Sequence, residues 1–268
     1  MSFLQKLRKI IKKNNSLLCV GLDTDIKKIP KAFLLKKKDP IFEFNKSIVD
    51  ATCDLVCAYK PNIAYYAAEG ITGFQSLIKT VHYIHTTYPT IPIILDAKRA
   101  DIGLTSEQYA REVFDVIGVD AVTVNPYLGL DALVPFLKRK DKGIIILCRT
   151  SNPGASDFQD LKVEGTPLYV KIAERVVLWN KEYGNCLMVV GATWPKELKK
   201  MREIARDMFF LIPGVGTQGG NLQKTLEFGL TKEKSGLIIN VSRAIIYASS
   251  VRIEAKKFCD IINRYRPT

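Results

Sequence analysis

The chain contains 268 residues, of which 47% are hydrophobic and 25% are charged, and its formal net charge is +13. This length and apolar content can bury one large core or two small ones. No run of the roughly 18 apolar residues that a membrane span needs occurs, which excludes a transmembrane helix. Nucleic-acid binding would need basic residues interleaved with aromatic stacking groups, or a known module, and neither is present. The positive charge instead suits an anionic small substrate, so we expect no dedicated nucleic-acid partner and no membrane partner.

Residues 1–15, MSFLQKLRKIIKKNN, are basic and amphipathic. They lack the apolar centre and the small-residue cleavage site of a signal peptide. Their apolar residues fall at helical spacing, at Phe3, Leu4, Leu7, Ile10 and Ile11. We expect a helix that packs on the domain, with a membrane-surface helix as the alternative. A cytoplasmic location follows as an expectation.

The residues that most often bind metals are sparse and scattered. The six cysteines show no metal-binding or disulfide pattern, and several lie in apolar segments, as small buried thiols do. His82 and His85 stand three apart without a cysteine or an acid at ligand spacing. The sequence therefore predicts neither a metal site nor a cofactor that such residues would hold.

Short aliphatic runs recur along the whole chain and alternate with segments of helical periodicity. The eight runs cover residues 16–22, 55–60, 91–96, 121–125, 143–148, 186–191, 209–214 and 236–240. The most periodic helical segments cover residues 43–55, 73–85, 106–118 and 195–208. Nearly continuous apolar strands alternating with helices are typical of a parallel sheet covered on both sides. Eight such units favour a single (β/α)8 TIM barrel over an open doubly wound sheet, with residues 1–268 as one domain and an extra N-terminal helix.

In such barrels the chemistry lies at the carboxyl ends of the strands. Asp96 and Lys98 follow the third run, and alternation along a strand predicts that both point into the barrel mouth. Lys60 ends the second run, and Asp101 lies near a helix that Thr105 or Ser106 would open. We therefore expect a cluster of alternating charge, shielded from water. A purely structural salt-bridge network is the alternative, although an apolar layer usually stabilises a barrel equally well.

A phosphate site is expected at the carboxyl ends of the last two strands. Residues 213–220, PGVGTQGG, contain glycines that let backbone N–H groups approach an anion. Ser242 and Arg243 stand where a helix begins after the eighth run, and a guanidinium there favours a dianion. The loops after strands 7 and 8 hold phosphate in many barrels. Taken alone, the glycine-rich segment could equally be an ordinary turn.

Six separated segments together resemble the orotidine 5′-phosphate decarboxylase family, in its order and over nearly the whole chain. They are LLCVGLDTD, AYKPN, LDAKRADIG, CRTSNPG, PGVGTQGG and NVSRAI. The resemblance is to the subgroup that carries DAKRADIG. One departure is Thr24, where the family pattern has proline, but the neighbouring Asp23 is intact.

The resemblance implies conversion of orotidine 5′-monophosphate to UMP and CO2, the last step of de novo pyrimidine biosynthesis, by a carboxy-lyase without metal or organic cofactor. It implies a homodimer in which the partner subunit supplies the acid at Asp101 together with the residues at Ile102 and Thr105. Lys98 would protonate carbon 6 and Asp96 would lie beside the departing carboxylate. The remaining roles would be ribose binding by Lys60 and Asp23, recognition of the pyrimidine edge by Ser151, and phosphate binding by Gln218, Ser242 and Arg243.

Two other functions stay open at this point. An Mg²⁺-dependent sugar-phosphate lyase of the same superfamily, of the hexulose-phosphate synthase type, resembles this chain in D-x-K-x-x-D but stabilises an enediolate. Lys60 and the continuation DIGLT favour the orotidine reading. A non-catalytic barrel that binds nucleotides or RNA is the second alternative, and the intact Asp–Lys–Asp set argues against it.

Overall fold

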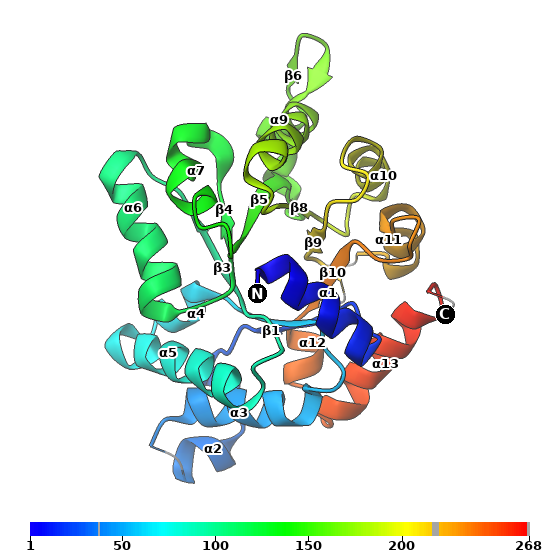
Figure 1. Cartoon of the computed structure of the whole chain (residues 1–268). Helices are drawn as coiled ribbons and strands as arrows, with labels where there is room; N and C mark the ends of the chain where they lie inside the picture. The colour runs from blue at the N-terminus through cyan, green and yellow to red at the C-terminus, as the bar shows by residue number, and fades with distance from the viewer. Residues whose placement is uncertain (37, 216–219, 267–268) are drawn as a thin grey trace.

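A computed structural model describes residues 1–36, 38–215 and 220–266 as parallel strands alternating with helices (Figure 1). The long strands are β1 (Leu18–Leu22), β2 (Ala58–Pro61), β3 (Ile94–Arg99), β4 (Ala121–Val124), β5 (Gly143–Arg149), β8 (Cys186–Val190), β9 (Phe210–Ile212) and β10 (Leu237–Val241). A short antiparallel hairpin consists of β6 (Lys162–Val163) and β7 (Thr166–Pro167). The α-helices are α1 (Phe3–Asn14), α2 (Lys31–Lys36), α3 (Pro40–Thr52), α4 (Ile63–Ala67), α5 (Gly70–Thr87), α6 (Gly103–Arg111), α7 (Leu130–Leu137), α8 (Ser156–Gln159), α9 (Leu168–Tyr183), α10 (Pro195–Ile204), α11 (Leu222–Gly229), α12 (Arg243–Ile246) and α13 (Val251–Asn263). Shorter turns are the 3-10 helices η1 (Ile26–Lys28), η3 (Pro126–Leu128) and η4 (Pro153–Ala155) and the π-helix η2 (Glu112–Ile117).

The eight long strands form one parallel sheet that is nearly closed on itself. Their order is β2-β1-β10-β9-β8-β5-β4-β3 in the described residues. Isolated bridges between Tyr59 and Ile93 and between Asn62 and Asp96 join the two end strands, β2 and β3. Closure removes the exposed sheet edges that an open sheet would leave unpaired. The predicted (β/α)8 barrel is therefore confirmed, and the doubly wound alternative is wrong.

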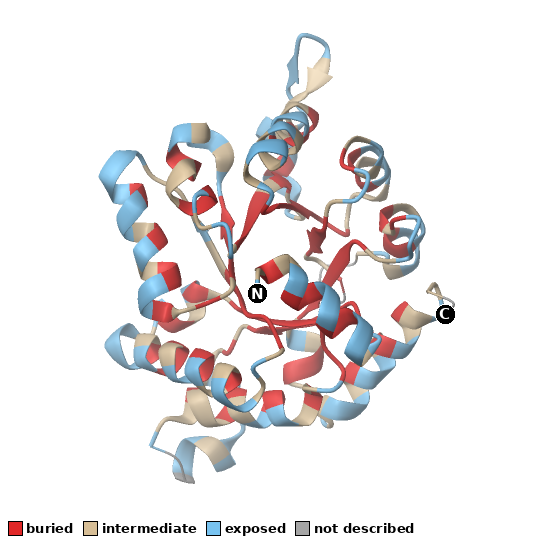
Figure 2. Cartoon of the chain, viewed as in Figure 1, coloured by how far each residue is buried: buried red, intermediate tan, exposed pale blue. Residues whose placement is uncertain are grey.

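Each predicted run overlaps one strand of the barrel, because strands covered on both faces need apolar side chains throughout. Every residue of β1, β2, β4, β8, β9 and β10 is buried. Figure 2 shows this buried centre and helices that bury only their inward faces. The boundaries differ most at β3, which begins at Ile94 and continues to Arg99, so Asp96 and Lys98 lie within the strand rather than after it.

Helix α1 crosses the amino-terminal end of the barrel, where it lies over the strands in Figure 1. Its predicted apolar face is confirmed, since Phe3, Leu7, Ile10 and Ile11 are buried. The Phe3 N–H donates to the Asp141 carbonyl at 2.7 Å, just before β5. A Cβ added to Gly143, the first residue of β5, would overlap the Phe3 ring. The helix therefore packs on the domain as predicted.

The helices that cover the barrel agree with the periodic segments, with different ends. Helix α6 begins at Gly103, two residues before Thr105, and a π-helical turn continues it to Ile117. The hairpin β6–β7, which extends outward beside α9 in Figure 1, has no counterpart in the predicted elements. None of the helices in the described part of the chain is both long and apolar enough to cross a membrane.

Candidate functional site

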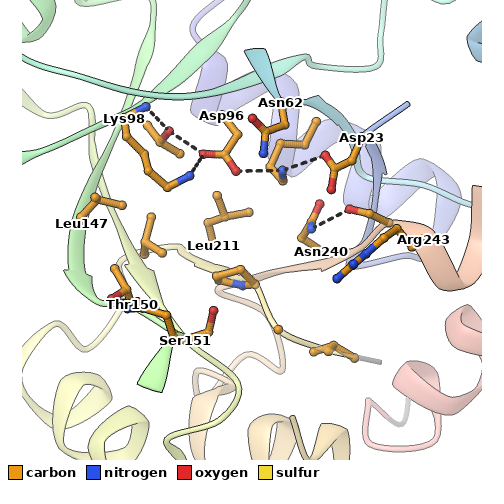
Figure 3. Close-up of a pocket in the computed structure, with 18 of the residues that line it drawn as sticks. Asp23, Asn62, Asp96, Lys98, Leu147, Thr150, Ser151, Leu211, Asn240 and Arg243 are labelled. Carbon is orange, nitrogen blue, oxygen red and sulfur yellow. Dashed lines mark hydrogen bonds and ion pairs between the residues drawn. The ribbon is translucent and has the colours of Figure 1, made fainter. Parts of the chain in front are cut away.

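A cavity of about 400 Å³ opens at the carboxyl ends of the barrel strands (Figure 3). Its polar lining residues are Asp23, Lys60, Asn62, Asp96, Lys98, Thr123, Thr150, Ser151, Asn152, Asn240, Ser242 and Arg243. Its apolar side includes Leu147, Val189, Leu211 and Val215. The cavity thus gathers residues that are far apart in the sequence at the end of the barrel where the chemistry was expected.

Four of the predicted residues form a chain of alternating charge along one side of this cavity. Lys98 Nζ lies 2.6 Å from Asp96 Oδ1, and Lys60 Nζ lies 3.1 Å from Asp96 Oδ2. Lys60 Nζ also lies 3.7 Å from Asp23 Oδ1. Asp96 therefore shares its two oxygens between two ammonium groups. In Figure 3, Arg243 lies across the cavity from Lys98 and Asp96.

Asp96 and Lys60 stay charged because each is attracted to neighbouring groups of opposite charge. Burial alone would raise the pKa of the Asp96 carboxyl, but the Lys60 and Lys98 ammonium groups outweigh it and hold that pKa well below its usual value. Burial would likewise lower the pKa of Lys60, but Asp96 and Asp23 raise it above its usual value. Both groups are therefore charged at neutral pH. Beneath them, burial raises the pKa of the Cys19 thiol to about 12, so this thiol stays neutral.

The backbone at Lys98 departs from the regular strand geometry that the predicted alternation of side chains assumes. Its φ is 50°, in the left-handed region that residues other than glycine seldom adopt. The β3–β4 register shifts between Leu95 and Arg99, which marks a bulge. Asp96 and Lys98 do share the barrel mouth, but the bulge, and not a regular pleat, turns Lys98 inward. The Lys98 side chain is also half exposed, so the expected shielding from water is wrong for this residue.

A series of buried hydrogen bonds holds the segment that carries Asp23. Thr24, the departure from the family pattern, is buried, and its hydroxyl donates to Asn45 Oδ1 at 2.6 Å. Asn45 in turn donates to the Tyr66 hydroxyl at 3.0 Å, and Tyr66 donates to the Leu22 carbonyl at 2.9 Å. A threonine at position 24 therefore ties the end of β1 to α3 and α4, which a proline side chain could not do by hydrogen bonding.

The segment that carries Ser151 is held by the buried Arg149 at the end of β5. The Arg149 guanidinium lies 4.1 Å from the Trp194 ring centroid and 3.0 Å from Asp160 Oδ2. Trp194 Nε1 donates to the Thr150 carbonyl at 2.8 Å. A Cβ on Gly191 would lie 2.7 Å from the Ser151 Cα, so only glycine lets Ser151 come this close to the end of β8.

The expected phosphate site is present in part. Ser242 immediately precedes α12, Arg243 is its first residue, and both line the cavity. A Cβ on Gly21 would overlap Ser242 Oγ, so glycine in β1 makes room for this side chain. Gln218 lies outside the described residues. Gly214 and Val215, from the same segment, line the cavity.

Asp101, Ile102 and Thr105 do not join the cluster within this chain. None of the three lines the cavity in the described structure, and Ile102 and Thr105 are exposed. The Asp101 carboxylate accepts the Ile102 N–H at 2.8 Å. The expectation that Asp101 lies with Lys60, Asp96 and Lys98 is therefore wrong for a single chain, because the bulge ends at Arg99 and the following segment leaves the barrel mouth.

The predicted site residues did not include five polar residues of the cavity: Asn62, Thr123, Thr150, Asn152 and Asn240. All but Thr123 stand inside the quoted motifs AYKPN, CRTSNPG and NVSRAI, which was the available signal. Asn240 Nδ2 donates to Ser242 Oγ at 3.3 Å. Thr123 lies in a strand whose sequence gives no sign of function. No three His, Cys, Asp or Glu side chains in residues 1–36, 38–215 and 220–266 are grouped so as to hold a metal ion.

Comparison with known proteins identifies relatives over nearly the full length. The profile of the orotidine 5′-phosphate decarboxylase / HUMPS family matches residues 16–258. The orotidine 5′-phosphate decarboxylase of Cellvibrio japonicus (strain Ueda107) is 54% identical over 93% of this chain and 91% of its own. That of Janthinobacterium sp. (strain Marseille) is 49% identical over 99% of both. The structure of Leishmania donovani OMP decarboxylase superimposes with a TM-score of 0.89 at 37% identity and covers 100% of both chains. This chain therefore belongs to the orotidine 5′-phosphate decarboxylase / HUMPS family.

Proposed function

We propose that the cavity binds orotidine 5′-monophosphate and that the chain, a carboxy-lyase, converts it to UMP and CO2, the last step of de novo pyrimidine biosynthesis. The observation that carries this proposal is the Lys98–Asp96–Lys60–Asp23 chain facing Arg243 across one cavity. Three cations and two carboxylates line that cavity among the described residues, which suits a substrate with a phosphate and a carboxylate. The relatives of about half identity carry the name of this activity.

The same relatives favour decarboxylation over the two alternatives. The family profile joins decarboxylases with the HUMPS group, so it does not by itself separate them. The curated relatives that match along nearly the whole chain are named orotidine 5′-phosphate decarboxylase. A non-catalytic barrel would not need two ammonium groups on one buried carboxylate, because such charges are costly to take out of water.

Substrate binding divides between the two sides of the cavity. We propose that Arg243, Ser242 and Gln218 bind the phosphate, since a guanidinium and hydroxyl or amide donors match its oxygens. Lys60 and Asp23 would hold the ribose hydroxyls, and Ser151 would hydrogen-bond the pyrimidine edge. This orientation directs the substrate carboxylate toward Asp96 and carbon 6 toward Lys98.

In the proposed reaction, the bond between carbon 6 and the carboxylate carbon breaks and its electron pair stays on carbon 6. CO2 leaves, and Lys98 Nζ donates a proton to carbon 6 to give UMP. The carbanion has no conjugated electron sink, so an ammonium at carbon 6 both stabilises the developing charge and supplies the proton. Lys98 then regains a proton from solvent, to which its side chain is half exposed.

Asp96 lies where it would repel the substrate carboxylate and be relieved as CO2 departs. One like-charge contact at about 4 Å is worth roughly 4 kcal/mol at an effective dielectric of about 20. The slowest reactions that enzymes accelerate need barrier reductions of about 20 kcal/mol. Repulsion is therefore a minor contribution. The larger ones are the preorganised Lys98 ammonium and binding energy from the phosphate and ribose.

Three finer assignments belong to the same proposal. LDAKRADIG at 95–103 supports membership in the DAKRADIG subgroup. The position of Asp101, Ile102 and Thr105 outside their own chain's cavity supports a homodimer in which these residues complete the partner's site, and Ile102 is 62% exposed. We also propose that residues 1–268 act as one domain in the cytoplasm. Sedimentation of the protein and fractionation of cells test the dimer and the location.

The proposed function is tested by mixing the protein with orotidine 5′-monophosphate in excess EDTA and following the ultraviolet change on formation of UMP. We expect turnover that EDTA does not reduce, and a kcat at least about 10³-fold lower for Lys98→Ala, since a positioned proton donor contributes up to about 10⁴-fold. Lys46→Ala, on the outer helix α3, is the matched control and should keep wild-type activity. An unimpaired Lys98→Ala enzyme would refute the role of Lys98, and turnover abolished by EDTA would favour the Mg²⁺-dependent lyase.

A further inference from the structure

Thr123, in the middle of β4, lies opposite the bulge that turns Lys98 into the cavity. Leu95 pairs with Val122 and Arg99 pairs with Val124, so three residues of β3 face Thr123 alone. A bulge of this size interrupts the regular ladder and leaves backbone N–H groups that need another acceptor. Thr123 is 1% exposed and lines the cavity, so its hydroxyl is enclosed together with these groups.

The Thr123 hydroxyl makes three hydrogen bonds, all to the segment that carries Asp96 and Lys98. Its oxygen accepts the Ala97 N–H at 3.0 Å and the Lys98 N–H at 2.9 Å. The same hydroxyl donates to Asp96 Oδ1 at 3.0 Å. A hydroxyl has one proton and two lone pairs, and these three bonds use all of them. The direction of each bond is therefore determined, with the proton directed to Asp96.

We infer that Thr123 is a positioning residue, which holds the Lys98 backbone in its left-handed conformation and the Asp96 carboxylate in its rotamer. The two accepted N–H bonds fall on the residues at the turn of the bulge, one of them Lys98 itself, whose φ is 50°. Such a conformation persists in a residue other than glycine only where its surroundings hold it. The donated bond falls on Oδ1, the oxygen that also faces Lys98 Nζ. One hydroxyl thus sets both partners of the Lys98–Asp96 pair.

The side chain suits this role better than a serine or a valine would. A β-branched residue has a restricted χ1 in a strand, so its hydroxyl stays aimed at the bulge. A valine has the same shape but would leave the Ala97 and Lys98 N–H groups without this acceptor, and buried donors without a partner are costly. The effect should fall on the chemical step, because the groups proposed for phosphate and ribose do not contact Thr123.

The inference rests on the proposed function, and its test compares Thr123→Val with Thr123→Ser. We expect Thr123→Val to lower kcat on the order of 10²-fold, as a misplacement of about 1 Å does. Inhibition by UMP, which lacks the carboxylate, should stay within about twofold of wild type, since the remote binding groups are intact. Thr123→Ser keeps the oxygen and should restore kcat to within about fivefold of wild type, because only the restriction of χ1 is lost.

Thr52→Val is the matched control for losing a buried threonine hydroxyl. Thr52 is fully buried, donates to the Ile48 carbonyl at 2.8 Å, and lies on α3 away from the cavity. It should lower stability but leave kcat at the wild-type value. Should Thr123→Val not fold, Thr123→Ala gives the same comparison, with a fall in kcat of about tenfold or more expected from the same displacement.

If the wild type converts orotidine 5′-monophosphate, two results would overturn the inference without affecting the proposed function. The first is a wild-type kcat in Thr123→Val. The second is equal losses of kcat and UMP affinity in Thr123→Val that Thr123→Ser does not restore. Absence of any turnover by the wild type would instead overturn the proposed function, and the inference with it.

Discussion

The two ends of the barrel treat charge differently. At the amino-terminal end, Lys6 Nζ lies 3.0 Å from both oxygens of Asp120, and Asp120 also accepts the Ile93 N–H at 2.8 Å. At the carboxyl end, Asp96 is shared by two ammonium groups that line a cavity. The first arrangement matches one cation to one anion beneath the apolar face of α1. The second brings three cations and two carboxylates together among the described lining residues, which suits an anionic ligand.

The comparison shows where stability and function are located in this fold. The same buried strands run from one end of the barrel to the other. What differs is the covering: Phe3 and its neighbours on α1 lie over one end, while the other carries a bulge, a glycine that admits Ser242, and an open cavity. Substitutions at the amino-terminal end should therefore change stability but not kcat, whereas those at the carboxyl end should change kcat or KM.

Phe3→Ala should have the largest effect on stability and none on catalysis. The Phe3 ring is 2% exposed and packs against Gly143, so its removal should lower the free energy of unfolding by about 3 to 5 kcal/mol, as other buried aromatic truncations do. Urea denaturation measures this change. The kcat of the folded fraction should stay at the wild-type value, because the cavity lies at the opposite end.

Phe158→Ala is the control for this variant. Phe158 is 67% exposed, so its truncation should change stability by less than about 0.5 kcal/mol. A Phe3→Ala protein that is as stable as Phe158→Ala would show that α1 does not stabilise the barrel end.

Asp96→Asn should lower both stability and activity, unlike Phe3→Ala. It leaves the buried Lys60 with only the more distant Asp23 and should lower the free energy of unfolding by about 3 kcal/mol near neutral pH. The folded-state pKa of Asp96 is below the unfolded value of about 3.9, so its contribution is present above roughly pH 4 and is lost as pH falls through the folded pKa. The pKa of Lys60 is raised, so its contribution persists below its unfolded value of about 10.4.

Urea midpoints of the wild type and Asp96→Asn measured from pH 3 to pH 9 check this expectation. The difference should be constant above about pH 5 and shrink in acid. Asp54→Asn, which removes an exposed partner of Arg252, should change stability by about 1 kcal/mol or less. A difference for Asp96→Asn that grows in acid would contradict the low pKa of Asp96.

Arg243→Ala should show the smallest effect and the most selective one. Loss of a guanidinium that binds phosphate should raise KM about 30-fold, in line with hydrogen bonds to charged groups. Stability should be unchanged because Arg243 is exposed. Orotidine, which lacks the phosphate, should be turned over equally by this variant and the wild type, and a loss with orotidine as well would place Arg243 elsewhere in the reaction. Arg252→Ala, on the outer helix α13, is the control and should leave KM unchanged.

Much of the fold and part of the site could be predicted from the sequence, because the responsible signals are local. Strands covered on both faces need continuous apolar runs, so all eight could be located, and an amphipathic pattern was enough to predict α1. The motif residues Asp23, Lys60, Asp96 and Lys98 lie together because the carboxyl ends of parallel strands converge.

Other features depend on which strands pair, and no local pattern contains that information. The left-handed conformation of Lys98 arises from the β3–β4 register, and the role of Thr123 depends on its lying opposite that bulge. Asp101 does not line the cavity, because β3 ends at Arg99, although its spacing from Lys98 suggested a shared site. Local patterns in the sequence are therefore enough to predict the barrel and the residues that bring charge to its mouth. The geometry of those residues depends on strand pairing, because a bulge and its hydrogen-bond partner come from different strands.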